Sequence, residues 1–375
     1  MQTFRALLLG FASLSLAAAA DIYTQHNLVS DRAGVADHQD QKLVNSWGID
    51  HSPTGPWWVN ANGTGFSQVY DGTGQAFPVA TPLSVTIPGP GGGASTPTGI
   101  VFNGTQDFQI AMGKPALFIF ATEDGTIAGW NSTVNGGVAV IPYDSKGGAV
   151  YKGIALGKLN GANVLFAANF RSGLVEMFDI TFTPVTLSMS AFHDPEIPAG
   201  YAPFNVQNVG GNIAVAYAQQ DADRHDEVAG RGKGYVSIFT PAGALVTRLH
   251  HGPWMNAPWA VVMSPADFGK LGNKYLVGNF GDGTIMAFRQ DGRFDGFMRG
   301  HKERVIRIDG LWGLGFGNGA NAGPANVLFF AAGPLDEKHG LFGTLTATSE
   351  KDRDHHDDHG GHDRGDHGRD RDDRD

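Results

Sequence analysis

A local pattern built around one small or polar residue recurs six times along the chain. Each copy is a short polar or proline-containing stretch that runs into an apolar segment, as in SWGID at 46–50 and LWGLG at 311–315. The residues that align the copies are Gly48, Gly99, Gly153, Asn205, Ala260 and Gly313, so successive copies lie 51, 54, 52, 55 and 53 residues apart. A nearly constant period of this length is typical of repeat architectures.

Each copy is followed by further β-rich runs separated by turn residues. NVLFAANFRSG at 163–173 and KYLVGNFGDG at 274–283 are equivalent second runs, and GLVEMFD at 173–179 and GTIMAFR at 283–289 are equivalent third runs. A fourth run usually follows, for example VTLSMSAF at 185–192, but the sixth unit lacks one. The segment 22–30 is a predicted strand with no anchor of its own. We therefore predict an all-β fold, a six-bladed β-propeller closed by an N-terminal strand.

The repeat also divides the chain into three regions. Residues 1–20 contain Arg5, an apolar stretch at 6–16 and the small residues 18–20, a pattern typical of a secretory signal peptide. About eleven apolar residues are too few to span a bilayer, and no later stretch is long enough. We expect a secreted or periplasmic protein with the propeller at 21–349 and no transmembrane segment after signal removal.

Residues 350–375 form a tail without apolar residues other than glycine, so we expect it to be disordered. Two roles stay open for it. Its histidines can bind Zn²⁺, Ni²⁺ or Cu²⁺ weakly, or the tail serves as a mixed-charge solubilising segment. The histidines are His355, His356, His359, His362 and His367.

Composition excludes several classes of protein. The chain has no cysteine, which excludes disulfide scaffolds, thiolate zinc sites and cysteine nucleophiles. Its formal net charge is −10 and no basic stripe stands out, which argues against nucleic acid as the main partner. No nucleophile elbow, Walker A loop or zincin motif occurs in a supporting context.

Polar residues gather in the loops that share one face of the predicted ring. These are the loops leading into the innermost strands and the loops between second and third strands. The candidates at this channel mouth are Asn45, Lys152, Asn205, Asn256, Asp309, Glu123, Asp124, Asn169 and Asn279. Oxygens from Asn205, Asn256 and Asp309 would suit a hard cation such as Ca²⁺ or Mg²⁺ in the channel. The alternative is that such residues cap turns and join neighbouring blades.

Two further features of this face carry alternatives. The insertion 218–234 includes His225, Asp226 and Glu227, and could be a lid, a cation site or a solvated loop. Four aromatic residues recur near the anchors, either as a ligand platform or as packing between blades. They are Trp47, Phe204, Trp259 and Trp312.

Whole segments resemble a family of exported bacterial six-bladed propellers without an assigned function. The matching segments include LVNSWGI, ATEDGTIAGW, FHDPEIPAGYAPFNV, LVGNFGDGTI and AAGPLDEKHGLFG, and the likeness extends to about Thr348. More distantly, the repeat resembles NHL-type propellers and the metal-dependent lactonases of the gluconolactonase (SMP-30-like) group. That second resemblance implies a Glu, an Asn and an Asp around one divalent ion, whereas the first-blade position carries Asn45.

Two functions follow as expectations. The first is a binding module that presents the loop face at the channel mouth to a small molecule, a glycan or a partner protein. The alternative is a hydrolase of lactonase type with a divalent cation in the central channel. The sequence offers no convincing general base for hydrolysis, which favours the binding module. The resemblance to lactonases does not outweigh this, because a fold alone does not determine function.

Overall fold

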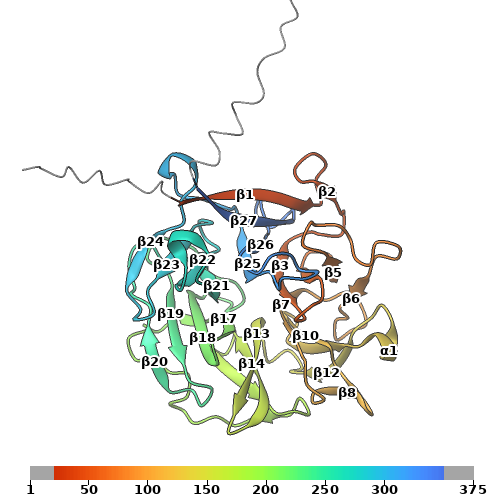
Figure 1. Cartoon of the computed structure of the whole chain (residues 1–375). Helices are drawn as coiled ribbons and strands as arrows, with labels where there is room; N and C mark the ends of the chain where they lie inside the picture. The colour runs from red at the N-terminus through yellow and green to blue at the C-terminus, as the bar shows by residue number, and fades with distance from the viewer. Residues whose placement is uncertain (1–20, 350–375) are drawn as a thin grey trace, which may run out of the picture.

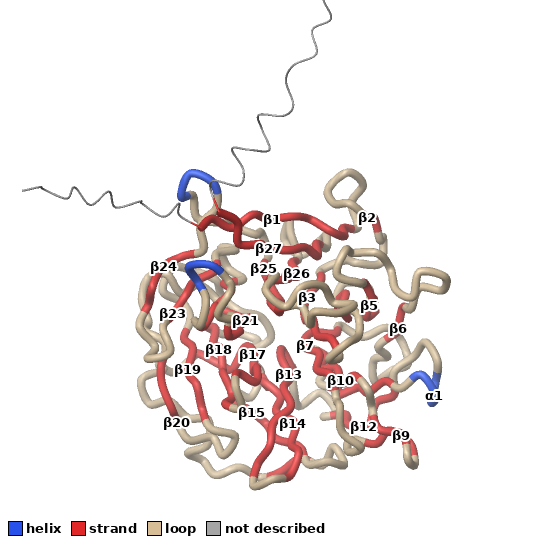
Figure 2. Tube along the Cα trace, in the orientation of Figure 1, coloured by secondary structure: helices blue, strands red, loops and turns tan. Residues whose placement is uncertain are grey.

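The structure, a computed structural model, describes residues 21–349. The leader 1–20 and the tail 350–375 lie outside the described residues, so both assignments stay predictions. Figure 1 shows sheets arranged as a ring around a central axis. The prediction of a six-bladed, nearly helix-free propeller is confirmed. Figure 2 shows that helical pieces are few and short; within the described residues they are α1 (Ser132–Asn135), η1 (Gly269–Leu271) and η2 (His301–Glu303).

Blades one to three are antiparallel sheets of four strands each, ordered from the axis outward. Blade one contains β3 (Ser46–His51), β4 (Trp57–Ala61), β5 (Phe66–Tyr70) and β6 (Ser84–Thr86). Blade two contains β7 (Pro97–Phe102), β10 (Phe118–Thr122), β11 (Thr126–Trp130) and β12 (Val140–Asp144), with a side hairpin of β8 (Gln109–Ala111) and β9 (Lys114–Pro115). Blade three contains β13 (Tyr151–Leu159), β14 (Ala162–Asn169), β15 (Leu174–Phe178) and β16 (Pro184–Val185).

Blades four and five follow the same plan, and blade six is a sheet of five strands. Blade four contains β17 (Tyr201–Val209), β18 (Asn212–Gln219), β19 (Tyr235–Phe239) and β20 (Leu245–Arg248). Blade five contains β21 (Pro258–Met263), β22 (Tyr275–Asn279), β23 (Ile285–Phe288) and β24 (Phe294–Phe297). Blade six contains β25 (Leu311–Phe316), β26 (Leu328–Ala332) and β27 (Leu341–Ser349), and it is completed by β1 (Asp21–Ser30) and β2 (His38–Gln39).

The N-terminal strand closes the ring as the sequence predicted. β1 pairs antiparallel with β27 from Asp21 opposite Ser349 to Ser30 opposite Leu341. Tyr23 ties this strand to blade five, because its hydroxyl donates to the carbonyl of Phe268 at 2.9 Å and accepts the amide of Leu271 at 3.0 Å. The two ends of the propeller are therefore held in one sheet.

One strand was predicted too long. The fourth run of blade three was expected at 185–192, but β16 has only two residues, Pro184–Val185. The chain then turns, with the amide of Ala191 donating to Ser188, so that Phe192 packs between Phe166 and Phe239. Burying this ring between blades three and four stabilises the loop more than extending an exposed edge strand would.

Every anchor residue lies at a β-bulge of the innermost strand. In all six blades the register between the first and second strands shifts at this point. A bulge reorients the side chains that follow it and tightens the local twist. The period read from the sequence is therefore the spacing of six bulges around the axis.

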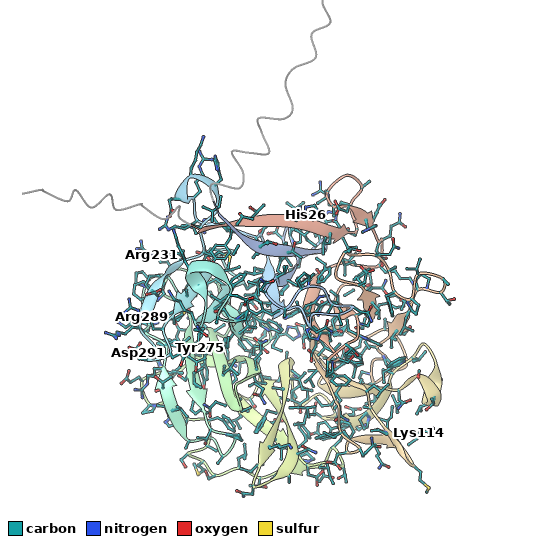
Figure 3. All side chains as sticks on the ribbon, viewed as in Figure 1. His26, Lys114, Arg231, Tyr275, Arg289 and Asp291 are labelled. Atoms are coloured by element: carbon teal, nitrogen blue, oxygen red, sulfur yellow. The ribbon has the colours of Figure 1, made fainter. Side chains whose placement is uncertain are left out.

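The anchor glycines are required because neighbouring inner strands touch at this level. A Cβ atom on Gly99 would lie 2.7 Å from the backbone nitrogen of Ile154, and one on Gly313 would lie 2.6 Å from the carbonyl oxygen of Trp47. The inner strands contact one another in sequence, and β25 contacts β3 to close the circle. Six clusters of buried side chains fill the spaces between the described blades. Figure 3 shows side chains filling the space between the ribbons, with Arg289 and Asp291 at the outer rim.

No helix within residues 21–349 is long and apolar enough to cross a membrane.

Candidate functional site

Lys152 occupies the centre of the face that carries the loops leading into the inner strands. It is the second residue of β13 and its side chain is 1% exposed. The ammonium nitrogen lies 2.5 Å from Oε1 of Glu123, in the β10–β11 turn, and 3.0 Å from Oδ1 of Asp226, in the insertion between β18 and β19. The side chain of Asp226 is 62% exposed, so the insertion reaches the site from the solvent side.

A chain of amide and carboxylate contacts continues from this pair to blades one and six. Asn62 donates from Nδ2 to Oε2 of Glu123 at 2.8 Å. Asn45 donates from Nδ2 to Oε2 of Glu337 at 2.6 Å and to Oδ1 of Asn62 at 3.3 Å. We call the assembled group the mouth cluster. Its members are Asn45, Asn62, Glu123, Lys152, Asp226, Glu227 and Glu337.

Strained backbone holds two members of the mouth cluster, Asn45 and Glu337, in place. Leu335, Asp336 and Glu337 have φ values of 59°, 55° and 61°, and Asn45 has a φ of 48°. Residues other than glycine adopt this left-handed region at a cost of about 1–2 kcal/mol each. Asp309 supports the turn, since its Oδ2 accepts the amide of Leu335 at 2.8 Å. Backbone strain of this kind concentrates at functional sites.

The charges of the cluster are unbalanced towards acid. Burial alone would lower the pKa of Lys152, but the carboxylates of Glu123, Glu227 and Asp226 raise it above its ordinary value. Burial raises the pKa of Glu227 to about 8, although nearby Lys152 opposes this shift. Burial likewise raises the pKa of Glu337, against its hydrogen bond from Asn45. At neutral pH Lys152 is therefore an ammonium and Glu227 is mostly protonated.

Aromatic rings close the channel directly below Lys152. Trp47 stacks on Trp312 with ring centroids 3.7 Å apart, and Phe280 stacks on the same ring at 4.0 Å. The ammonium of Lys152 lies 5.3 Å from the ring centroid of Trp47, within the range of a cation–π contact. The aromatic side chains that the sequence singled out are all buried and meet one another on the axis. They form the floor of the mouth cluster.

The candidate cation ligands are engaged separately. Asn205 donates from Nδ2 to the carbonyl of Trp259 at 2.9 Å. Oδ1 of Asn256 accepts the amide of Gly230 at 2.6 Å, and Asp309 accepts the amide of Leu335. No hydrogen bond or shared partner joins Asn205, Asn256 and Asp309 within residues 21–349.

Three other candidates bond within or next to their own blades. Asp124 accepts the hydroxyl of Ser95 and the amide of Thr96. Asn169 donates to Oε1 of Glu176 at 2.6 Å. Asn279 donates to the carbonyl of Trp254 at 2.8 Å.

The structure thus brings together Asn45, Lys152 and Glu123 from the predicted set. It adds Asp226 and Glu227 from the insertion, whose length was the available signal. It also adds Glu337, which had no sequence signal beyond its place in a loop of the same face.

One group of side chains in the described region has the geometry of a metal site. Ligand atoms of Glu123, His225 and Asp226 lie within 4.8 Å of one another. Lys152, however, is hydrogen-bonded to two of these three residues, and its charge occupies the position that a cation would take. A divalent ion would have to displace the ammonium, so the residues present fit a lysine-centred cluster better than a resident metal.

Comparison with known proteins supports the fold and shows a relative. No model of a known protein family matches the chain. The structure is similar to a virginiamycin B lyase from Staphylococcus aureus, with a TM-score of 0.51 and 14% identity over 87% of this chain and 99% of that one. It is also similar to an auxiliary nutrient binding protein from Bacteroides thetaiotaomicron, with a TM-score of 0.54 and 10% identity over 87% and 77% of the two chains. At these identities the likeness shows the fold alone.

Sequence comparison gives a nearer relative. The chain is 31% identical over 329 residues to uncharacterized protein R648 of Acanthamoeba polyphaga mimivirus, covering 85% of this chain and 78% of the relative. This relative is viral, so the comparison does not support the expected membership of an exported bacterial family. The chain, a six-bladed β-propeller, therefore belongs to the same family as protein R648 of the mimivirus.

Proposed function

We propose that this propeller is a binding module that receives a positively charged group of a small molecule or partner at the mouth cluster. The observation that carries the proposal is the convergence of side chains from five blades on one group in which carboxyl groups outnumber cations. Glu123, Asp226, Glu227 and Glu337 surround a single lysine, with His225 beside Asp226. A complementary ligand would supply the missing positive charge.

The protonation of Glu227 supports this choice of ligand. The pKa of this carboxyl group is raised to about 8 chiefly because burial disfavours its charged form, and the neighbouring carboxyl groups of Glu337 and Asp226 add to the shift. A ligand ammonium would lower that pKa and release the proton. Binding should therefore be coupled to proton release near neutral pH.

The experiment compares a cationic probe with an uncharged analogue. Spermidine and its triacetylated derivative are titrated calorimetrically into the wild-type protein, Glu227→Gln and Asp291→Asn. Asp291 lies at the outer rim, and its substitution removes an exposed acid far from the mouth. We expect saturable, salt-sensitive spermidine binding that releases protons, with proton release abolished in Glu227→Gln and retained in Asp291→Asn. Equal binding of the acetylated analogue, or no difference among the proteins, contradicts the proposal.

A metal-dependent hydrolase of lactonase type is the second candidate. It is favoured by the convergence of Glu123, His225 and Asp226. The discriminating measurement is metal content after dialysis of wild type and Glu123→Gln, both carrying the same histidine-rich tail, together with hydrolysis of a simple lactone. A stoichiometric Ca²⁺ or Mg²⁺ that Glu123→Gln loses, with loss of lactone hydrolysis, would support the hydrolase. If wild type and Glu123→Gln hold equal amounts of metal and neither hydrolyses the lactone, the hydrolase is excluded and the binding module is favoured.

Export is a separate proposal that rests on the sequence pattern of residues 1–20. The mature chain should begin at Asp21, which is also the first residue of β1. N-terminal sequencing of the protein recovered from the medium or periplasm tests this. An intact leader on the functional protein contradicts it.

A further inference from the structure

The channel has a second end, which opens on the face opposite the mouth cluster. A cavity of about 240 Å³ lies there, and the second halves of all six inner strands line it. Since every inner strand begins at the mouth, residues such as Ile100, Leu156 and Val262 lie at the far end of the axis. The ring of Trp259 lines this cavity and contacts the rings of Trp47 and Trp312, and Trp47 in turn contacts the ammonium of Lys152.

Most side chains that line the cavity are apolar, but polar atoms make up about half of its surface, and polar side chains lie at two places. On one side, Asp50 accepts the amides of Phe102 at 2.7 Å and His51 at 2.8 Å. The two ring nitrogens of His51 lie 2.9 Å from the carbonyl oxygen of Ser52 and 2.8 Å from that of Phe316. These two side chains are occupied by the backbone and do not offer a donor to the cavity.

Gln207, on the other side, has a donor to spare. Its Oε1 accepts the amide of Val261 at 2.5 Å and Nδ2 of Asn205 at 3.2 Å, which fixes the orientation of the side-chain amide. Within residues 21–349 nothing accepts a hydrogen bond from its Nε2, and the side chain is only half-buried and lines the cavity. A few preorganised polar groups among apolar side chains are the usual arrangement for orienting a small ligand, and the Nε2 donor of Gln207 is such a group.

We propose that this far cavity binds a small uncharged ring compound that carries a carbonyl or ether oxygen, with that oxygen accepting from Nε2 of Gln207. The volume allows about ten heavy atoms, because a cavity of about 150 Å³ holds benzene. Anions are disfavoured by the carboxyl group of Asp50, and the apolar side chains that make up most of the lining favour an uncharged ring over a strongly hydrated cation. The site is independent of the mouth cluster.

The test uses acetophenone as the probe, with ethylbenzene, which lacks the acceptor, and benzoate, which is charged. Binding is measured by calorimetry and by the fluorescence of the protein, since Trp57 and Trp259 line the cavity. We expect saturable acetophenone binding, tighter than that of either analogue. In Gln207→Met the affinity for acetophenone should fall about three- to tenfold, the worth of one hydrogen bond, while that for ethylbenzene is unchanged.

Two variants keep the result interpretable. Val262→Trp should fill the cavity from a partly exposed position in its wall and abolish binding, with an unchanged circular dichroism spectrum. Glu227→Gln, at the mouth, should leave acetophenone binding intact whether or not the mouth binds cations. The proposal is overturned if acetophenone fails to bind at millimolar concentration, if it binds no better than ethylbenzene, or if correctly folded Val262→Trp still binds it.

Discussion

Replacing Glu227 by glutamine should stabilise the protein, and the gain should grow with pH. The carboxyl group of Glu227 has its pKa raised from 4.5 to about 8 by burial. Between these two values the unfolded chain has already lost the proton that the folded chain keeps. The unfolded state then binds fewer protons, so the free energy of unfolding falls as pH rises through this window.

The size of this effect on the free energy of unfolding follows from the pKa shift, at about 1.36 kcal/mol per pKa unit. The full shift corresponds to about 1 kcal/mol of lost stability at pH 5, about 3 at pH 7 and about 5 at pH 9. Because the side chain is only half-buried, solvent screening reduces these values. We expect Glu227→Gln to gain roughly half of them, which is about 1–2 kcal/mol at pH 7.

Urea denaturation at pH 5, 7 and 9 measures this gain. The matched control is Asp223→Asn, which removes an exposed carboxylate from the same insertion. Its effect should be small and should not grow with pH in this range. A pH-independent difference between wild type and Glu227→Gln, or a loss of stability in the variant, would refute the electrostatic reasoning about the mouth cluster.

Three further variants test other parts of the structure by urea denaturation at pH 7. Lys152→Met should destabilise by about 3–5 kcal/mol, because it leaves Glu123 without its buried partner, whereas exposed Lys114→Met should change little. Gly99→Ala should lower the free energy of unfolding by about 1–3 kcal/mol, since its Cβ atom would meet the backbone of blade three. Gly91→Ala is the control and should change stability little, because a Cβ atom there would have no neighbour within 4 Å. Tyr23→Phe should cost about 1–3 kcal/mol by leaving the Phe268 carbonyl and the Leu271 amide without their partner.

The fold was predictable from the sequence because its closure depends on local features that repeat. The anchor position is a bulge in every blade, and four of the six anchors are glycine. Close backbone contact around a narrow axis allows few alternatives at such a position. The N-terminal strand was predictable because the sixth unit lacks a strand and residues 22–30 lack an anchor.

The site was only partly predictable, because it depends on how loops fold over one another. Asn45 directly precedes β3 and Lys152 is the bulge residue of β13, so both are placed by the repeat. Asp226 reaches Lys152 only because the insertion folds back, with the amide of Asp221 donating to the carbonyl of Asp226. Glu337 is placed by consecutive left-handed residues that have no signature glycine. Asn256 and Asp309 are residue types that often bind cations, yet here the side-chain oxygen of each accepts a hydrogen bond from a loop backbone amide.

The bulges link the fold to the mouth cluster physically. Lys152 directly precedes Gly153, whose Cα atom packs against Asn205 and would leave no space for a Cβ atom. The carbonyl of Lys152 accepts Nε1 of Trp259 at 3.0 Å, which joins blade three to the aromatic floor. The same backbone segment thus closes the ring, seats the floor and aims the ammonium at Glu123. A substitution at Gly153 should therefore weaken both ligand binding and stability. Glu227→Gln should instead raise stability while it abolishes the proton release that accompanies ligand binding.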